Sequence, residues 1–236
     1  ARARPVHYNC WEAVYFDHNL PELKEIADRA ADLGAERFVL DDGWFGDRDD
    51  DTTSLSDWEV DPRKYPEGLT PLIDHVHGLG MSFGIWFEPE MINEDSNVFR
   101  AHPDWALGGE DQILGRQQMA LNMALPEVRD FLFDRIGKVL GDNDIDYIKW
   151  DHNRVLPMPD AAQTRGSYAL IDQLRAAFPK VEIESCASGG GRIDFGILKR
   201  THRVWLSDSN DAIERLRMQH NAALFLPMVV TGSHVG

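Results

Sequence analysis

The stretch that decides the fold is Tyr147-Ile148-Lys149-Trp150-Asp151-His152-Asn153, an apolar run that turns polar at its end. Such a run predicts a buried strand with a polar carboxyl end. Because Lys149 and Asp151 are two residues apart, both side chains point to the same face of that strand. If the strand belongs to a barrel, the shared face is the barrel interior.

Short apolar runs recur on both sides of this strand and alternate with amphipathic stretches. The expected strands are residues 11–16, 37–40, 81–87, 118–123, 147–150, 181–186, 203–206 and 228–231. Helical periodicity predicts helices at residues 21–33, 69–79, 126–140, 165–178, 194–201 and 212–225. Eight strands with helices between them match the (β/α)₈ barrel, whose usual length is about 250 residues. The sequence therefore predicts an α/β fold, a (β/α)₈ TIM barrel with its last helix truncated.

Polar residues at the ends of the expected strands favour the barrel over a doubly wound open sheet. They are Asp41, Asp42, Glu88, Glu90, Asp151, Cys186 and Asp208. In a barrel these positions face one mouth, whereas an open sheet spreads them along an edge. Two long segments, 45–65 and 93–117, also follow strand ends, and we expect them to form a wall of an active site. The acidic run at 47–51 lacks the glycine and glutamate of an EF-hand, so we expect a solvated loop and no metal site there.

Composition narrows the possible partners and ligands. The chain carries 24 Lys and Arg against 40 Asp and Glu, a formal net charge of -16, which repels nucleic acid and anionic lipid surfaces. No apolar stretch approaches the roughly 18 residues of a membrane span. The two cysteines, Cys10 and Cys186, are far apart and have no CxxC partner. This argues against a disulfide framework and structural zinc, so we expect a cytoplasmic protein without metal or cofactor.

The ends of the sequence bear on its domain organisation. The chain begins Ala-Arg-Ala-Arg-Pro without an initiator methionine, and it stops just after an apolar run. We therefore expect residues 1–236 to be a single catalytic barrel domain excised from a longer protein.

The candidates for catalysis are the acids that follow two of the expected strands. Asp151 lies near Lys149, which favours an ionised carboxylate suited to a nucleophile. The alternative is a structural ion pair, although burying two charges for stability alone is costly. Asp208 follows the strand at 203–206, whereas Asp211 is a good helix N-cap, so Asp208 is the better candidate for an acid at the mouth. Two carboxylates that face each other across a barrel mouth have the geometry of a glycosidase.

Aromatic residues and glycines near these acids suit a sugar ligand. Trp44, Trp86 and Trp150 each lie close to a strand-end carboxylate. Flat rings beside acids fit the apolar face and polar rim of a pyranose, although core packing is the alternative for each ring. The run from Glu184 to Arg192 enters a triple-glycine turn. Such a turn suits either a phosphate or the close approach of an uncharged ligand.

Seven stretches, in order along the chain, resemble the catalytic domain of the α-galactosidases of glycoside hydrolase family 36. They include the Lys-Trp-Asp strand and a CxxGxxR pattern, and they are residues 11–17, 40–46, 84–91, 116–118, 149–154, 186–192 and 205–215. The resemblance implies retaining hydrolysis of terminal α-galactosides of the melibiose or raffinose type through a covalent galactosyl-enzyme intermediate. It assigns the nucleophile to Asp151 and the general acid/base to Asp208.

The resemblance also implies a galactose subsite. Its residues are Asp41, Asp42, Trp86, Arg116, Lys149, Asn153 and Cys186, and the predicted substrate-binding set is completed by Trp150, Gly189 and Arg192 from the same motifs. Members of the family carry an N-terminal β-sandwich and a C-terminal β-domain and are commonly homotetramers, which we expect of the full-length parent. Galactosyl transfer of the raffinose-synthase type and a sugar-binding barrel without turnover are the alternatives.

Overall fold

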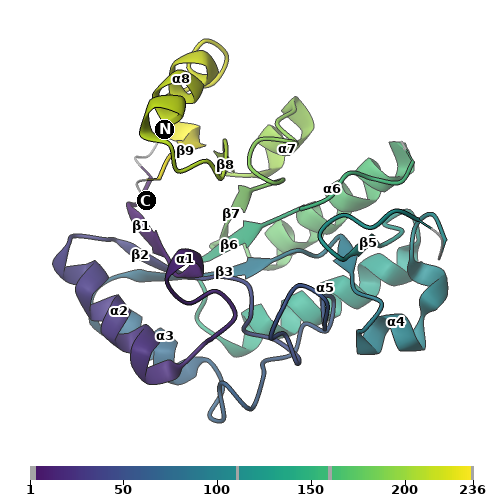
Figure 1. Cartoon of the computed structure of the whole chain (residues 1–236), viewed down its shortest axis with the longest axis horizontal. Helices are drawn as coiled ribbons and strands as arrows, with labels where there is room; N and C mark the ends of the chain where they lie inside the picture. The colour runs from purple at the N-terminus through teal and green to yellow at the C-terminus, as the bar shows by residue number, and fades with distance from the viewer. Residues whose placement is uncertain (1–3, 110–111, 159–160, 235–236) are drawn as a thin grey trace.

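A computed structural model describes residues 4–109, 112–158 and 161–234 of the chain. Its centre is a parallel sheet of seven strands in the order β1-β2-β3-β6-β7-β8-β9. The strands are β1 (His7–Asn9), β2 (Arg37–Leu40), β3 (Ser82–Phe87), β6 (Tyr147–Trp150), β7 (Glu182–Ser185), β8 (Arg203–Trp205) and β9 (Thr231–Gly232). The sheet curls into a partial barrel, and among the described residues no pairing joins β9 to β1 (Figure 1). The predicted α/β barrel class is confirmed, with a barrel that is incomplete in this chain.

Residues 11–16 do not form the first strand, so this prediction is wrong. Trp11–Val14 is a short helix, α1, and the first strand is β1, just before it. Only Val14 of this helix is buried, whereas Glu12 and Ala13 are exposed, an arrangement that suits one turn of helix. The residues of β1 are half-buried, so no apolar run marks this strand in the sequence.

The expected strand at 118–123 lies outside the barrel. Only Met119–Ala120 is extended, as β5, and it pairs antiparallel with β4 (Met91–Ile92) in a separate two-stranded sheet. β3 instead pairs directly with β6, with Gly84 opposite Tyr147. A Cβ atom at Gly84 would lie 2.8 Å from the Tyr147 ring, so the glycine permits this pairing. The described sheet consequently has seven strands where the sequence predicts eight.

The six predicted helices are confirmed, with shifted ends. They are α2 (Leu20–Asp32), α3 (Thr70–Gly78), α5 (Pro126–Asp142), α6 (Ala161–Ala177), α7 (Phe195–Arg200) and α8 (Ala212–Ala222). Asn19 caps α2 by accepting a hydrogen bond from the backbone N–H of Glu22, and Pro21 occupies the first turn. In Figure 1, α2 and α3 lie on the side of β1, β2 and β3, α5 and α6 lie on the side of β6 and β7, and α8 stands apart near β8 and β9, at the other end of the sheet. Of the last expected strand, residues 228–231, the first three form the short helix η2 (Met228–Val230) instead. No described helix is long and apolar enough to cross a membrane.

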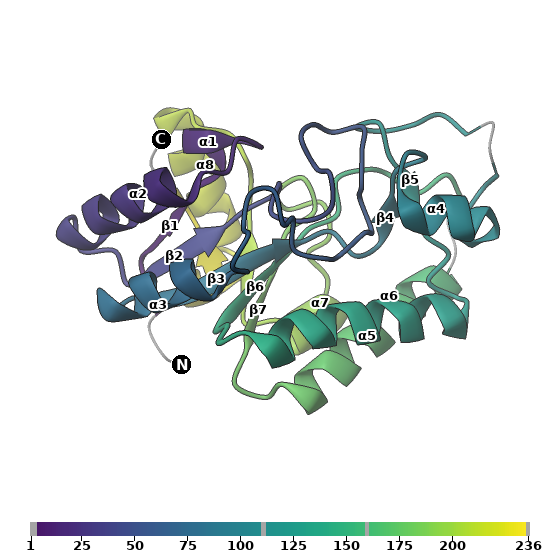
Figure 2. The same cartoon turned by 90° about the horizontal axis from the view of Figure 1, so that it is seen from below.

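The two long segments pack together beyond the strand ends. In the first, the Phe45 and Trp58 rings lie with centroids 4.5 Å apart, and Trp58 also contacts Trp86 of β3. The second contains α4 (Asn97–Ala101) and η1 (Pro103–Trp105). Asp57 joins the two segments by accepting hydrogen bonds from the first two backbone N–H groups of α4. Figure 2 shows this wall around β4 and α4, above α5 and α6 in that view, and the Trp105 ring of the wall contacts the Phe131 ring of α5.

Candidate active site

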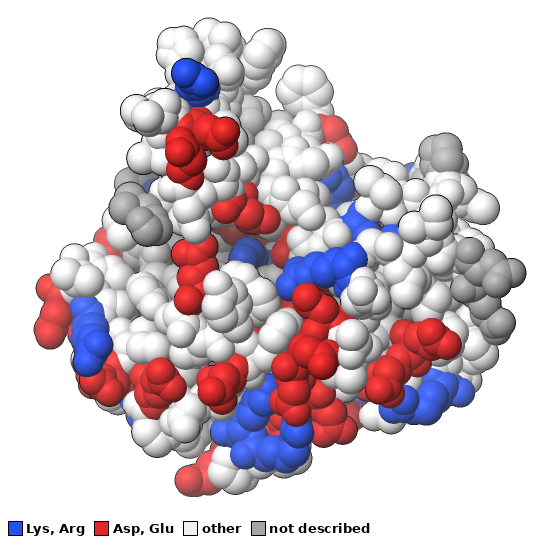
Figure 3. Space-filling model, in the orientation of Figure 1, with Lys and Arg blue, Asp and Glu red and all other residues white. Residues whose placement is uncertain are grey.

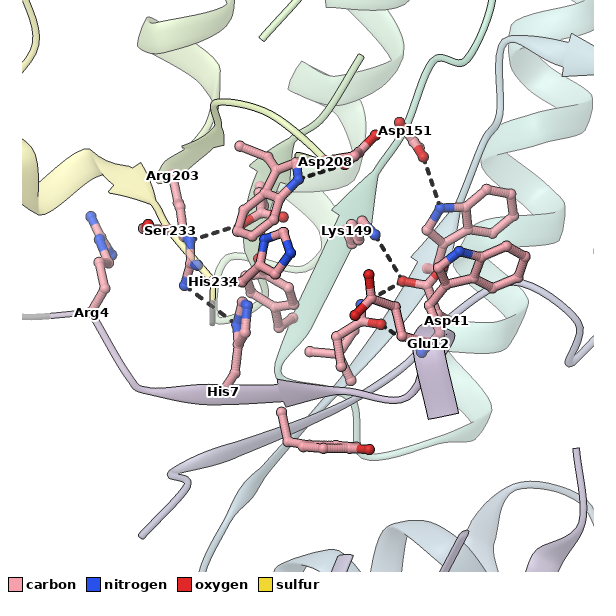
Figure 4. A pocket seen from close by; sticks show the side chains of 18 of the residues that line it. Arg4, His7, Glu12, Asp41, Lys149, Asp151, Arg203, Asp208, Ser233 and His234 are labelled. Carbon is pink, nitrogen blue, oxygen red and sulfur yellow. Dashed lines mark hydrogen bonds and ion pairs between the residues drawn. The ribbon is translucent and has the colours of Figure 1, made fainter. Parts of the chain in front are cut away.

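A cavity of about 1080 Å³ occupies the interior of the curled sheet. Residues at the carboxyl ends of the strands line it, such as Asp41 and Asp151, and so do residues deeper in the barrel, such as Tyr147 and Arg203. Figure 3 shows a hollow on this face with acidic and basic side chains inside it, and Figure 4 shows lining side chains that come from several strands. A polar cavity at the carboxyl ends of barrel strands is the usual place for an active site.

The structure brings most of the predicted site residues to this cavity. Those that line it are Asp41, Trp86, Arg116, Lys149, Asp151, Asn153 and Asp208. Those that do not are Asp42, Trp150, Cys186, Gly189 and Arg192. The second group supports the site from behind, as the contacts of each residue show.

Asp151 follows β6 and is held by several hydrogen-bond donors. Its carboxylate accepts hydrogen bonds from Trp86 Nε1 at 3.1 Å and from Asn153 Nδ2 at 2.6 Å. The backbone N–H of His152 donates to its other oxygen at 2.8 Å. With only 5% of the residue exposed, these donors fix the orientation of the carboxylate within the cavity.

The charge of Asp151 is set by its neighbours. Burial favours the neutral acid, but the ammonium of Lys149 and a hydrogen bond from the Cys186 thiol hold the pKa of Asp151 below its usual value. Lys149 Nζ lies 2.9 Å from Asp41 Oδ2, and Asn9 donates to the same oxygen. Burial alone would lower the pKa of Lys149, yet Asp41 foremost keeps it well above the usual range. The cavity therefore contains an ionised carboxylate next to a Lys–Asp pair, as Figure 4 shows.

Asp208 lies in the exposed loop after β8, where Trp205 Nε1 donates a hydrogen bond to its carboxylate at 2.7 Å. Burial and then the charges of Asp151 and Asp208 raise the pKa of the Cys186 thiol, against the opposing charge of Lys149. Figure 4 shows Asp208 and Asp151 close together among the side chains that line the cavity. Asp211 instead caps the first turn of α8. This division of roles agrees with the prediction that Asp208 faces the mouth and Asp211 serves the helix.

Asp42 does not line the cavity, although the family resemblance predicts a contact with galactose. Its two carboxylate oxygens accept hydrogen bonds from Arg48 Nε at 3.0 Å and Arg48 Nη2 at 2.9 Å. Both side chains are almost fully buried. Consecutive residues of an extended chain point to opposite sides. Because Asp41 points into the cavity, Asp42 points away from it, towards Arg48.

Trp150 and Arg192 also lie outside the cavity, contrary to their predicted place in the sugar site. Both donate to Oε1 of Glu90, and the Trp150 Nε1 bond measures 2.9 Å. Because Lys149 and Asp151 face the cavity, the residue between them must face the opposite side of β6. There Ser167 of α6 donates to the other oxygen of Glu90. These contacts tie β3, β6, α6 and the loop after β7 together.

Gly189 and Cys186 lie behind Asp151 and Asp208. Gly189 has a φ of +86°, and a Cβ atom there would lie 2.6 Å from the Cα of Ser207. Only glycine allows the loop after β7 to pack so closely on the segment that precedes Asp208. Cys186 is 1% exposed and donates from its thiol to Asp151. Both residues therefore act on the placement of the two carboxylates.

Arg116 reaches the cavity from the second long segment. Its φ is +53° and that of Gln117 is +58°, two consecutive left-handed residues that no glycine relieves. The guanidinium donates to Asp51 at 3.1 Å and lies 5.6 Å from the centroid of the Trp11 ring, which also lines the cavity. The strained backbone of this turn places the Arg116 guanidinium at the mouth of the cavity.

The acidic run of the first long segment is neutralised by nearby cations. Arg63 lies 2.9 Å from Asp49 and 2.7 Å from Asp61, and Lys64 lies 3.1 Å from Asp49. Within residues 4–109, 112–158 and 161–234, no group of three or more His, Cys, Asp and Glu side chains is arranged to hold a metal ion.

Sequence reasoning missed several residues of this site. Asn9, Trp11 and Trp205 line the cavity, and Glu88 lies buried directly behind Asn153. The misplaced first strand hid Asn9. The position of Glu88 at a strand end was a signal for its importance, but the pattern carried no information about its partners.

A curled parallel sheet whose strand ends place carboxylates, a Lys–Asp pair and a tryptophan around one cavity is the architecture of a barrel glycoside hydrolase. A family model described as Melibiase matches residues 1–236. The chain belongs to the melibiase family, among the α-galactosidases of glycoside hydrolase family 36.

Known α-galactosidases are similar to this chain over its whole length or nearly so. The sequence is 53% identical to an α-galactosidase of Escherichia coli, over 100% of this chain and 34% of that protein. The crystal structure of the GH36 α-galactosidase AgaB from Geobacillus stearothermophilus superposes with a TM-score of 0.94 and 41% identity, over 99% of this chain and 34% of that one. A variant of AgaA from the same organism, in complex with raffinose, gives a TM-score of 0.93 and 40% identity, again over 99% and 34%. The chain thus spans about one third of the length of these relatives.

Proposed function

We propose that this chain is the catalytic domain of a longer α-galactosidase, which hydrolyses terminal α-galactosides of the raffinose and melibiose type with retention of configuration. The observation that carries the proposal is the Asp151 carboxylate, which is ionised, held by three hydrogen bonds and turned into a polar cavity. Family membership and the raffinose complex of AgaA support the substrate class.

In the first step, a carboxylate oxygen of Asp151 attacks the anomeric carbon of the galactose, and the bond from that carbon to the leaving oxygen breaks. Asp208 donates its proton to the leaving oxygen. The products are a galactosyl ester of Asp151 and the free aglycone. Because hydrogen bonds already fix the Asp151 carboxylate, the attack requires little reorientation of this side chain.

In the second step, Asp208 takes a proton from water, and the water oxygen attacks the same anomeric carbon. The ester bond breaks, which returns Asp151 to its carboxylate form and Asp208 to its acid form. Two displacements at one carbon restore the starting configuration, so the first product is α-galactose. The exposed position of Asp208 suits this role, since it must meet both the leaving group and water.

The Lys149–Asp41 pair is suited to select galactose. An ammonium that donates and a carboxylate that accepts, 2.9 Å apart, can bind two adjacent hydroxyl groups by charge-assisted hydrogen bonds. We assign the axial O4 to this pair. An equatorial O4 leaves a charged group unpaired in a buried site, and such sites reject the wrong epimer strongly.

Hydrolysis of a chromogenic α-galactoside by the full-length protein, beside the matching β-galactoside and α-glucoside, tests the proposal. We expect turnover of the α-galactoside alone, and NMR of the first product should show the α-anomer. The β-anomer as first product contradicts retention. Galactosylated products that predominate at high acceptor concentration indicate a transferase, and tight binding without turnover indicates a sugar-binding barrel.

Three further properties follow from the family resemblance and belong to the same proposal. The full-length protein carries flanking β-domains, assembles as a homotetramer and is cytoplasmic. Light scattering on the full-length protein in solution measures the assembly, and a monomer contradicts it.

A further inference from the structure

Two buried carboxyl groups share one amide beside the cavity. Asn153 Nδ2 donates to Asp151 Oδ2 at 2.6 Å and to Glu88 Oε2 at 3.1 Å. The backbone N–H of Asn153 donates to Glu88 Oε1 as well. Glu88 is 0% exposed and does not line the cavity, so it acts on the site through Asn153.

No cation among the described residues lies within 4 Å of the Glu88 carboxyl group. The nearby Arg116 pairs with Asp51, and Lys149 pairs with Asp41, so no described ion pair reaches Glu88. The charged groups that face Glu88 are Asp151, after β6, which raises the pKa of Glu88, and Arg116, before β5, which lowers it by less. Two ionised carboxylates on one amide repel each other, and a buried carboxylate without a counter-charge is costly.

The proton therefore stays on the carboxyl group that lacks a cation. Lys149 stabilises the charge of Asp151, whereas burial foremost and then the charge of Asp151 raise the pKa of Glu88 to about 8. Gln118 Nε2 lies 2.7 Å from Glu88 Oε1, and Gln118 Oε1 is a buried acceptor without a partner among the described residues. Turning over the Gln118 amide brings this oxygen against Glu88, where it can accept the acid proton.

We propose that Glu88, as a neutral acid, is a positioning residue that holds the Asn153 amide on the nucleophile Asp151. Both hydrogens of this amide are then committed to carboxyl groups, which turns Asn153 Oδ1 towards Ser188 and the cavity as an acceptor for a sugar hydroxyl. The proposal rests on the proposed function, since it assumes that Asp151 is the nucleophile.

Substitutions of Glu88 in the full-length protein test the positioning role. Glu88→Ala should lower kcat by about 100-fold in folded enzyme, because Asp151 and Asn153 lose their common support. Glu88→Gln keeps the shape and the neutral charge, and it should restore kcat to within about fivefold of wild type at pH 6. If the alanine variant does not fold, Glu88→Asp is measured in its place. Its shorter side chain draws the carboxyl group back from Asn153 and should lower kcat by about tenfold. Wild-type kcat in the alanine or aspartate variant, or a glutamine variant as slow as alanine, overturns the inference.

The charge state of Glu88 is tested without any substrate. Since its pKa is raised by folding, Glu88 contributes stability below its unfolded value near 4.5, and this contribution is lost as pH rises through about 8. Relative to Glu88→Gln, the wild type should therefore lose roughly 5 °C in Tm between pH 5 and pH 8. A difference in Tm that does not change with pH overturns the neutral-acid assignment. If this difference appears but Asp151→Asn retains full activity, the proposed function fails while the charge assignment stands.

Discussion

Glu88 and Glu90 lie two residues apart after the same strand, and both are almost fully buried, yet their surroundings differ. Glu88 contacts the amides of Asn153 and Gln118 and faces a second carboxylate. Glu90 contacts the guanidinium of Arg192. Burial raises the pKa of both, but Arg192 and hydrogen bonds lower that of Glu90 to about 2. For these two equally buried acids, the partner decides which one is charged.

The acidic residues at the strand ends also fall into two groups, according to whether they face the cavity or the opposite side, called here the support side. On the cavity side lie Asp41 and Asp151, which contact or face Lys149. On the support side lie Asp42 and Glu90, each held by an arginine that is itself buried or nearly so. The cavity side should therefore govern rate and specificity, and the support side should govern stability.

The largest effect is expected at the nucleophile. Asp151→Asn keeps the shape of the side chain but removes the attacking charge, so kcat for an α-galactoside should fall by about 10⁴-fold or more. Tm should change by only a few degrees, because the single oxygen of Asn can still accept from Trp86 and only the bond from the backbone N–H of His152 is lost. Kinetics and thermal melts of the full-length variant check both statements. A large loss of Tm with retained activity would show that Asp151 stabilises the fold and does not attack the sugar.

Asp208 and Asp211 form a matched pair three residues apart. Asp208→Asn should lower kcat by about 10²–10³-fold for substrates with poor leaving groups, and azide should restore turnover of an activated substrate by forming α-galactosyl azide. Asp211→Asn should stay within a few-fold of wild type, since Asn is an equally good N-cap. Equal losses in the two variants, measured with the same raffinose-type substrate, contradict the assignment of the acid/base.

Asp41 and Asp42 test the division most directly, because they are adjacent. Asp41→Asn should lower kcat/KM for the α-galactoside by roughly 10- to 100-fold and reduce the preference over the α-glucoside, since the bond with Lys149 loses its charge. Asp42→Asn leaves the buried Arg48 with only the half-exposed Asp51, 3.8 Å away, as counter-charge, and should lower stability by about 3 kcal/mol. Unchanged epimer preference in the Asp41 variant would show that this pair serves the scaffold.

The smallest effect on rate is expected for Glu90→Gln. Folding lowers the pKa of Glu90, so its contribution to stability is present above the unfolded value near 4.5 and is lost as pH falls towards about 2. The variant should therefore melt roughly 5–10 °C below wild type at pH 7, with a difference that shrinks below pH 4. Thermal melts across this pH range measure it, and a difference that grows with acid would contradict the ionised state of Glu90.

The sequence was sufficient for the barrel class and for the side on which Lys149 and Asp151 lie, because strand periodicity fixes side-chain direction. Asp208 lies in the loop after β8, where only its place at a strand end pointed to the mouth. It was insufficient for the first strand, whose residues are only half-buried. It also misplaced Trp150, since motif membership does not say which face of a strand a residue occupies. The partners of Glu88 come from the loop after β6 and from the segment before β5, far away in the chain, so no local pattern could predict them.

The central claim is that Asp151 attacks the sugar. The most direct test is to treat the full-length protein with an α-galactosyl donor that carries fluorine beside the anomeric carbon and an activated leaving group, which slows the second step more than the first. Mass spectrometry of the digested protein should then find one galactosyl group on the peptide that contains Asp151, and none in Asp151→Asn. A label on Asp208, Glu88 or Asp41, or release of β-galactose without any label, would contradict the account.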